Sequence, residues 1–191
     1  MTDREKIVKP SKWKQDYQGN LFQILRNEKG WEKAVRAPGV RLILDDREAG
    51  KILLNREFRA ELNDYDFRLP GGKVFDSLAE YNDFSESGGD IDKRAIEKVV
   101  AEAREETGYD IANPELIAKS VLGATVEWDL FVFAVTDFSK RASGQELEEG
   151  EEIETDLWFS YEEVKQMILN GSMREERIAL VLFRYLEYNH Q

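Results

Sequence analysis

The stretch VVAEAREETGYD, residues 99–110, places three glutamates at helical spacing directly before a glycine. Glu102, Glu105 and Glu106 are three and four residues apart, so an α-helix brings their carboxylates to one side. They flank the apolar stripe of the same helix instead of opposing it. Like charges at the edge of a core are costly unless a cation lies among them. The pattern therefore indicates either a solvated acidic face or a cation site.

The types of ligand that the chain lacks narrow the choice of cation. It contains no Cys, and its single His is His190, beside the C-terminus. Disulfides, thiolate or His-rich zinc sites, cysteine nucleophiles and Ser–His catalysis are therefore excluded. Oxygen ligands alone favour Mg²⁺ or Mn²⁺, which usually act on phosphate-bearing substrates.

Composition limits the setting of this site. The 191 residues carry a formal net charge of −12, which argues against nucleic acid and anionic membranes as partners. No apolar run is long enough for a membrane span, and the N-terminus has no signal-like apolar core. We expect a cytoplasmic protein with one compact domain, or one domain with an appended arm.

The remaining pattern mixes strands and helices without a regular alternation. Strands are expected on both sides of a turn at 27–30, at 40–44 and 52–54, before the Pro-Gly-Gly turn at 70–72, and within 116–123, 127–138 and 153–160. Helices are expected from Asp92, as the cap, to a stop at Gly108, and within 160–172 and 174–188. Residues 75–92 are predicted to form an exposed acidic loop. The predicted class is α+β, with a mixed sheet.

Taken together, these residues resemble the Nudix hydrolase signature: Gly, five residues, Glu, seven residues, then Arg-Glu-apolar-any-Glu-Glu-any-Gly-apolar. Its end is matched by Glu102, Ala103, Glu105, Glu106, Gly108 and Tyr109, and its opening is similar to LPGGK at 69–73. Ala101 stands where the signature has an Arg that holds the glutamates in place, and Lys98 is a partial substitute one turn earlier. About fifteen residues are inserted, and Lys93 stands at the place of the leading Glu.

The resemblance implies a Nudix-type α/β/α sandwich around a mixed sheet. It also implies Mg²⁺ or Mn²⁺ ligands from Glu102, Glu105 and Glu106 and from the backbone carbonyl of Gly71. Such a site would hydrolyse a diphosphate that is linked to a second group.

Beyond the signature, the chain resembles the ADP-ribose and nucleotide-sugar pyrophosphatase branch of that family. ILLNREFR, residues 52–59, implies a substrate-contacting Arg59, and GWEKAVR, residues 30–36, implies that Trp31, Glu32 and Arg36 hold the nucleoside, often from a partner subunit. Residues 1–38 would then be a hairpin arm for a homodimer and residues 39–191 the Nudix domain. In the acid-rich loop 146–152, Glu149 or Glu151 would be the base or a metal ligand, so catalytic roles fall to these two and Glu105.

These assignments predict Mg²⁺-dependent hydrolysis of an ADP-ribose-like nucleoside diphosphate sugar to a nucleoside monophosphate and a sugar phosphate. Two alternatives stay open: a nucleoside triphosphate pyrophosphohydrolase, and a catalytically weak Nudix-fold regulator that binds a nucleotide. Structural readings also exist for single residues. Trp31 can be a packing residue of the hairpin, Arg59 can be a surface pair for Glu57 or Glu61, and the loop 146–152 can be a solvated charge run.

Overall fold

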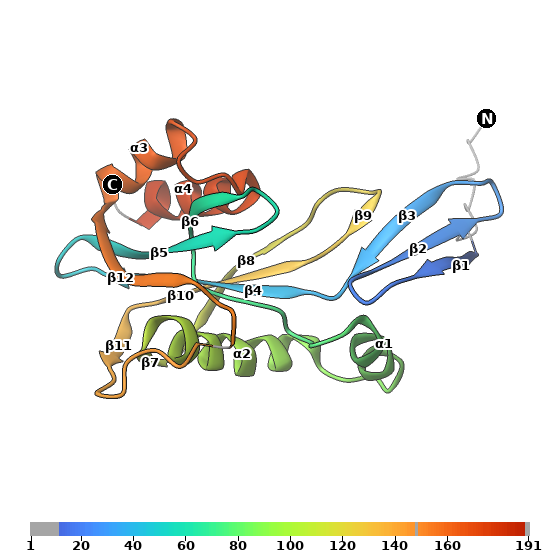
Figure 1. Ribbon diagram of the computed structural model, residues 1–191, viewed down its shortest axis with the longest axis horizontal. Coiled ribbons are helices and arrows are strands. Elements are labelled where there is room, and N and C mark those ends of the chain that lie inside the picture. The colour runs from blue at the N-terminus through green and yellow to red at the C-terminus, as the bar shows by residue number, and fades with distance from the viewer. Residues whose placement is uncertain (1–11, 148, 190–191) are drawn as a thin grey trace, which may run out of the picture.

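A mixed β-sheet with helices on both faces forms the body of the protein, and a smaller sheet projects from one end (Figure 1). The computed structural model describes residues 12–147 and 149–189. The strands are β1 (Trp13–Gln18), β2 (Phe22–Asn27), β3 (Glu32–Arg36), β4 (Gly39–Asp46), β5 (Lys51–Arg59), β6 (Asp64–Arg68), β7 (Tyr109–Ala112), β8 (Glu115–Ser120), β9 (Val126–Glu127), β10 (Leu130–Val135), β11 (Asp137–Lys140) and β12 (Ile153–Ser160). The helices are α1 (Leu78–Glu86), α2 (Ile91–Glu102), the π-helical turn η1 (Ala103–Thr107), α3 (Tyr161–Leu169) and α4 (Glu176–Asn189).

The central sheet has the strand order β12-β5-β4-β10-β8, and β6 pairs with β5. Its middle strands, β4 and β10, run parallel and are almost entirely buried, as expected for near-continuous apolar strands covered on both faces. The other pairs of this sheet are antiparallel. The predicted mixed sheet is confirmed.

Side chains along β4 and β10 point alternately to the two faces of the sheet, and this produces two separate cores. Leu42 and Phe131 face one core, which α2 closes, whereas Ile43 and Val132 face the other, which α3 and α4 close. Successive side chains of a strand point to opposite faces, so two apolar faces need two helical layers. Figure 1 shows these layers, with α1 and α2 on one side of the sheet and α3 and α4 on the other.

The helix with the three glutamates begins earlier than its sequence indicates. Asp90, not Asp92, is the N-cap, and its carboxylate accepts a hydrogen bond from the backbone N–H of Lys93 at 3.0 Å. The predicted end is confirmed, because Gly108 adopts a left-handed conformation that terminates η1.

The prediction of an exposed loop at 75–92 was wrong, because this segment contains α1. Ser77 caps α1 by accepting a hydrogen bond from the N–H of Glu80 at 3.1 Å. The fully buried ring of Phe75 packs against Tyr81 and Phe84 of α1, with centroids 5.3 and 5.1 Å apart. A short helix with so few apolar positions is stabilised by these contacts more than by its own periodicity.

The N-terminal strands form a second sheet in the order β1-β2-β3-β9. The predicted hairpin of β2 and β3 is confirmed, and the side chain of Asn27 stabilises its turn by accepting hydrogen bonds from the N–H groups of Lys29 and Trp31. β1 was not predicted; all its residues are exposed. Residues 1–11 of the predicted arm lie outside the described residues, and a domain boundary at residue 38 remains a prediction.

Within residues 12–147 and 149–189, no helix is both long enough and apolar enough to cross a membrane.

Candidate active site

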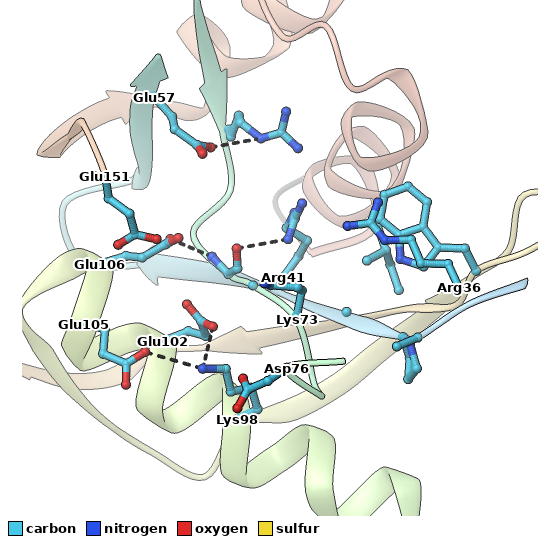
Figure 2. A pocket seen from close by; sticks show the side chains of 18 of the residues that line it. Arg36, Arg41, Glu57, Lys73, Asp76, Lys98, Glu102, Glu105, Glu106 and Glu151 are labelled. Carbon is cyan, nitrogen blue, oxygen red and sulfur yellow. Dashed lines mark hydrogen bonds and ion pairs between the residues drawn. The ribbon is translucent and has the colours of Figure 1, made fainter. Parts of the chain in front are cut away.

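A pocket of about 260 Å³ opens where α2 and η1 meet the loop after β6 and the start of β4. Its walls contain acidic and basic side chains (Figure 2). The acidic residues are Glu57, Asp76, Glu102, Glu105, Glu106 and Glu151, and the basic residues are Arg36, Arg41, Arg59, Arg68, Lys73 and Lys98. A pocket with both signs of charge is suited to an anionic ligand that binds together with cations.

The helical wall presents the three signature glutamates at different depths. Ala95, Val99 and Ala103 anchor the helix in the core, which leaves Glu102 and Glu106 only 7 % and 9 % exposed. η1 follows directly, so the backbone spacing changes from the α-helical to the wider π-helical turn between Glu102 and Glu106. No feature of the sequence predicted this turn, which alters the relative directions of the carboxylates.

The Pro-Gly-Gly turn lies directly against these carboxylates. A β-carbon on Gly72 would lie 2.1 Å from Oε1 of Glu102, so any larger residue would displace this carboxylate from its position. The N–H of Gly71 donates to Oε2 of Glu106 at 2.8 Å, and Nδ2 of Asn55 donates to the same oxygen at 3.1 Å. Glu106 is therefore held by two neutral donors.

Burial makes this acidic wall electrostatically costly. Burial, together with the charge of Glu102, raises the pKa of Glu106 to about 8. Burial also raises the pKa of Glu102, although the ion pair with Lys98 opposes that shift. Burial disfavours the charge on Lys98 as well, but its ion pairs with Glu102 and Glu105 prevail and raise its pKa. The wall therefore favours any cation that reaches it.

The ligand atoms available in this pocket fit Mg²⁺ or Mn²⁺. The pocket offers carboxylate oxygens and the carbonyl of Gly71, the hard ligands that these ions prefer. Lys98 already places a cation there, with Nζ 2.9 Å from Oε1 of Glu102 and 3.5 Å from Oε2 of Glu105. Among the described residues, no three acidic side chains converge on one point, so a divalent ion requires Glu105 and Lys98 to turn.

Arginines dominate the opposite wall, and an acidic residue outside the pocket holds two of them. Glu175 forms ion pairs with Arg68 and, at 3.4 Å, with Arg41. Nη1 of Arg41 then donates to the carbonyl of Gly71 at 3.0 Å. A chain of polar contacts thus links Glu175, just before α4, to the turn that contacts Glu106.

The other two arginines are held differently. Nη1 of Arg59 is 2.7 Å from a carboxylate oxygen of Glu57. The guanidinium of Arg36 lies 4.1 Å from the ring centroid of Trp128, and burial, with the nearby charge of Arg41, lowers its pKa. A cation held by an aromatic ring keeps its hydrogen-bond donors available for a ligand.

The structure brings together most of the site residues predicted from the sequence. Seven line the pocket: Arg36, Arg59, Gly71, Glu102, Glu105, Glu106 and Glu151. Trp31, Glu32 and Glu149 do not line it. Trp31 is 65 % exposed on the arm, and Glu32 forms an ion pair with Arg26 at 2.8 Å. Glu148, from the same acidic loop, lies outside the described residues.

Sequence reasoning missed two arginines of the basic wall, Arg41 and Arg68, together with Trp128 beside Arg36 and the supporting Glu175. Arg41 could have been recognised from the sequence, because it is the one charged residue inside the otherwise apolar run 40–44. A buried arginine in a central strand needs a partner, and here that partner lies 134 residues away.

Comparison with known proteins supports the fold. No protein-family model and no curated protein sequence matches the chain. A solved structure titled "Crystal structure of ADP compounds hydrolase" is similar over 97 % of this chain and 99 % of that one, with a TM-score of 0.64 and 11 % sequence identity. At this identity the similarity shows the fold alone. The predicted Nudix-type sandwich is thereby confirmed.

Proposed function

We propose that the protein hydrolyses the pyrophosphate bond of a nucleoside diphosphate sugar, with ADP-ribose as the type of substrate, in a reaction that requires Mg²⁺ or Mn²⁺. The observation that carries this proposal is a pocket with three helical glutamates on one wall and arginines on the other. A diphosphate needs both: divalent cations for its non-bridging oxygens and guanidinium groups for the remaining charge. The similar fold of an ADP compounds hydrolase supports a nucleotide substrate.

In this proposal each wall has a defined task. Glu102, Glu105, Glu106 and the carbonyl of Gly71 hold the metal, which when bound supplies charge neutralisation and lowers the pKa of a bound water. Arg41, Arg59 and Arg68 orient the diphosphate. Their charges face the oxygens on which negative charge develops in the transition state.

Glu151 is the candidate base, because it lines the pocket whereas Glu149 does not. It accepts a proton from the attacking water, whose oxygen forms a new bond to one phosphorus. The bond from that phosphorus to the bridging oxygen breaks, and the other phosphate leaves with this oxygen. The products are a nucleoside monophosphate and a sugar phosphate.

One feature favours a second candidate, a weakly active nucleotide-binding regulator. The signature arginine is replaced by Ala101, and Lys98 already forms ion pairs with Glu102 and Glu105. A protein of this kind would bind the nucleotide while its turnover stays at background.

The test is monophosphate release from ADP-ribose, GDP-mannose, dinucleotides and nucleoside triphosphates, with Mg²⁺ or Mn²⁺. We expect metal-dependent turnover of a nucleotide sugar, and a loss of at least ~100-fold in Glu105→Gln. The matched control is Glu97→Gln, an exposed glutamate on the same helix, which should retain activity. Turnover of triphosphates alone would reassign the substrate. Nucleotide binding without turnover would favour the regulator.

A further inference from the structure

A second cavity, of about 90 Å³, adjoins the main pocket, and we name it the α1 cavity. Both cavities have Arg36 and Pro38 in their walls. From there the α1 cavity extends to Tyr81 of α1 and to three charged residues of the β8–β10 region, Lys119, Glu127 and Asp129. The inserted segment, which has no counterpart in the Nudix signature, therefore builds a wall next to the candidate active site.

The charges around the α1 cavity are balanced. Lys119 pairs with Asp129 at 3.0 Å, and Lys33 pairs with Glu127. With Arg36 and Lys119 against Glu127 and Asp129, the lining has no net charge but several hydrogen-bonding groups. This is unlike the main pocket, which has an acidic wall and a wall rich in arginines. Such a lining selects a neutral ligand that has many polar groups.

Tyr81 adds a fixed aromatic donor to this lining. Its ring packs against the buried Phe75, which fixes the direction of the phenol. Burial raises the pKa of Tyr81, and the charges of Glu127 and Asp129 raise it further, so the hydroxyl stays protonated. A protonated phenol donates one hydrogen bond and accepts others, as a hydroxyl-rich ligand requires.

The size of the cavity sets a limit on its ligand. A water molecule takes about 30 Å³ of liquid volume, so the cavity has room for roughly three waters. Three waters can be replaced by the hydroxyl groups on one edge of a sugar ring, whereas a nucleoside is too large. Hydroxyls that reproduce the hydrogen bonds of the displaced waters bind without loss of affinity.

We propose that the α1 cavity binds the hydroxyl edge of the terminal, non-nucleoside sugar of the substrate, and that Tyr81 and Asp129 determine this specificity. The sugar hydroxyls donate to Asp129 and Glu127 and accept from Tyr81 and Lys119. The proposal rests on the proposed function for the identity of the substrate, but its test does not require turnover.

The test compares the binding of ribose 5-phosphate and of inorganic phosphate by calorimetry, with Mg²⁺ present. The wild type should bind ribose 5-phosphate at least ~10-fold more tightly, since several hydrogen bonds add to the phosphate contacts. Tyr81→Phe and Asp129→Asn should reduce this ratio to near one and leave phosphate binding unchanged. The matched controls, Tyr188→Phe and Asp137→Asn, are exposed residues away from both cavities and should keep the wild-type ratio.

Equal affinity of the wild type for the two ligands would overturn the proposal, whether or not the protein hydrolyses ADP-ribose. An unchanged ratio in both Tyr81→Phe and Asp129→Asn would also overturn it. Conversely, a retained preference for ribose 5-phosphate in a protein without hydrolase activity would support the sugar subsite while the proposed reaction fails. Thermal unfolding of each variant confirms that the fold is intact.

Discussion

Lys98 is the residue at which the site departs most clearly from the family signature. Its ammonium group lies between Glu102 and Glu105 and neutralises carboxylates that would otherwise repel each other. The signature places an arginine at position 101, where this chain has alanine. The structure thus shows a cation reaching the same glutamates from one turn earlier on the helix.

We predict that Lys98→Met lowers the free energy of unfolding of the metal-free protein by about 1–3 kcal/mol, because the buried carboxylate of Glu102 loses its partner. Mg²⁺ should restore part of this loss, since the divalent ion replaces the missing charge. Urea unfolding with and without Mg²⁺ measures both effects. Lys93→Met, at an exposed position on the same helix, should change neither value. An equal destabilisation with and without Mg²⁺ would contradict this role.

For Glu106 we expect the opposite outcome in the same unfolding measurement. Its carboxylate is buried between two neutral donors, and burial raises its pKa to about 8. Glu106→Gln keeps an oxygen that can accept from Gly71 and removes the buried charge. We therefore predict that the metal-free variant is at least as stable as the wild type above pH 8, and that Mg²⁺ no longer stabilises it. A large loss of stability would show that the carboxylate itself supports the fold.

The acidic half of the site could be predicted from the sequence because its residues lie on one helix. Helical spacing places Glu102, Glu105 and Glu106 on one side, and the resemblance to the Nudix signature selects a metal site over a solvated acidic face. On the basic wall, Arg36 and Arg59 were predicted through the family resemblance. Arg41, Arg68 and their partner Glu175 could not be predicted as a group, because they come from β4, β6 and the segment before α4. These residues meet only in the folded chain, so no local sequence pattern predicts their ion pairs.

Among the elements, α1 shows how tertiary contacts override a weak local signal. The segment is acidic and has one fully buried residue in its helix, Leu78, so its sequence resembles a loop. Its stability comes from outside the helix, through the aromatic cluster with Phe75. The long strands and the helices with a continuous apolar stripe were predicted, because their periodicity extends over many residues.

Phe84→Ala should lower the free energy of unfolding by about 2 kcal/mol, less than for a fully buried ring, because Phe84 is only half-buried. The variant should also lose the preference for ribose 5-phosphate, since α1 carries Tyr81. Asp83→Ala, an exposed neighbour, serves as the control for both measurements. If Phe84→Ala is destabilised but retains the preference for ribose 5-phosphate, the packing of α1 is not needed for sugar binding.

A buried carboxylate links α3 and α4 to the sheet, in addition to the apolar core between them. Asp45 of β4 accepts hydrogen bonds from the hydroxyls of Tyr161 and Tyr185, both at 2.7 Å. Burial, reinforced by these bonds, raises the pKa of Tyr185 to about 12 from its ordinary 10.0. The neutral phenol is thus favoured in the folded state.

A raised pKa in the folded state means that the folded protein binds more protons between these two values, so stability falls as the pH rises. We predict that the free energy of unfolding decreases from about pH 10 towards pH 12, and that Tyr185→Phe makes this decrease shallower. Urea unfolding as a function of pH tests it, with Tyr188→Phe as the exposed control. If the free energy of unfolding falls equally steeply with pH in the wild type, Tyr185→Phe and Tyr188→Phe, the raised pKa does not belong to Tyr185.

At the scale of the whole molecule, the acidic chain and the basic wall are compatible. The net charge of −12 opposes binding of polyanions in general, whereas a diphosphate is accepted where arginines and cations are concentrated. The sheet of β1, β2, β3 and β9 projects from one end of the body (Figure 1). Trp31 and Glu32, which belong to the arm, do not line the pocket of their own chain.

We propose that the arm reaches the pocket of a second copy of the chain. It exposes Trp13, Tyr17, Leu21 and Trp31. Among the described residues, β1 pairs with β2 on one side only, so its other edge is open. Light scattering should therefore give about twice the 22.2 kDa mass of one chain. Trp31→Ala should weaken both dimerisation and nucleotide binding. A monomer with full nucleotide affinity would contradict this arrangement.

The most direct test of the central claim is the rate of AMP release from ADP-ribose as Mg²⁺ is titrated, in the wild type and in Glu106→Gln. The account predicts no release in the absence of divalent metal, saturation as Mg²⁺ fills the carboxylate wall, and a loss of at least ~100-fold in the variant. Release at the same rate in both proteins, or release that persists after chelation of the metal, would contradict the assignment of this pocket.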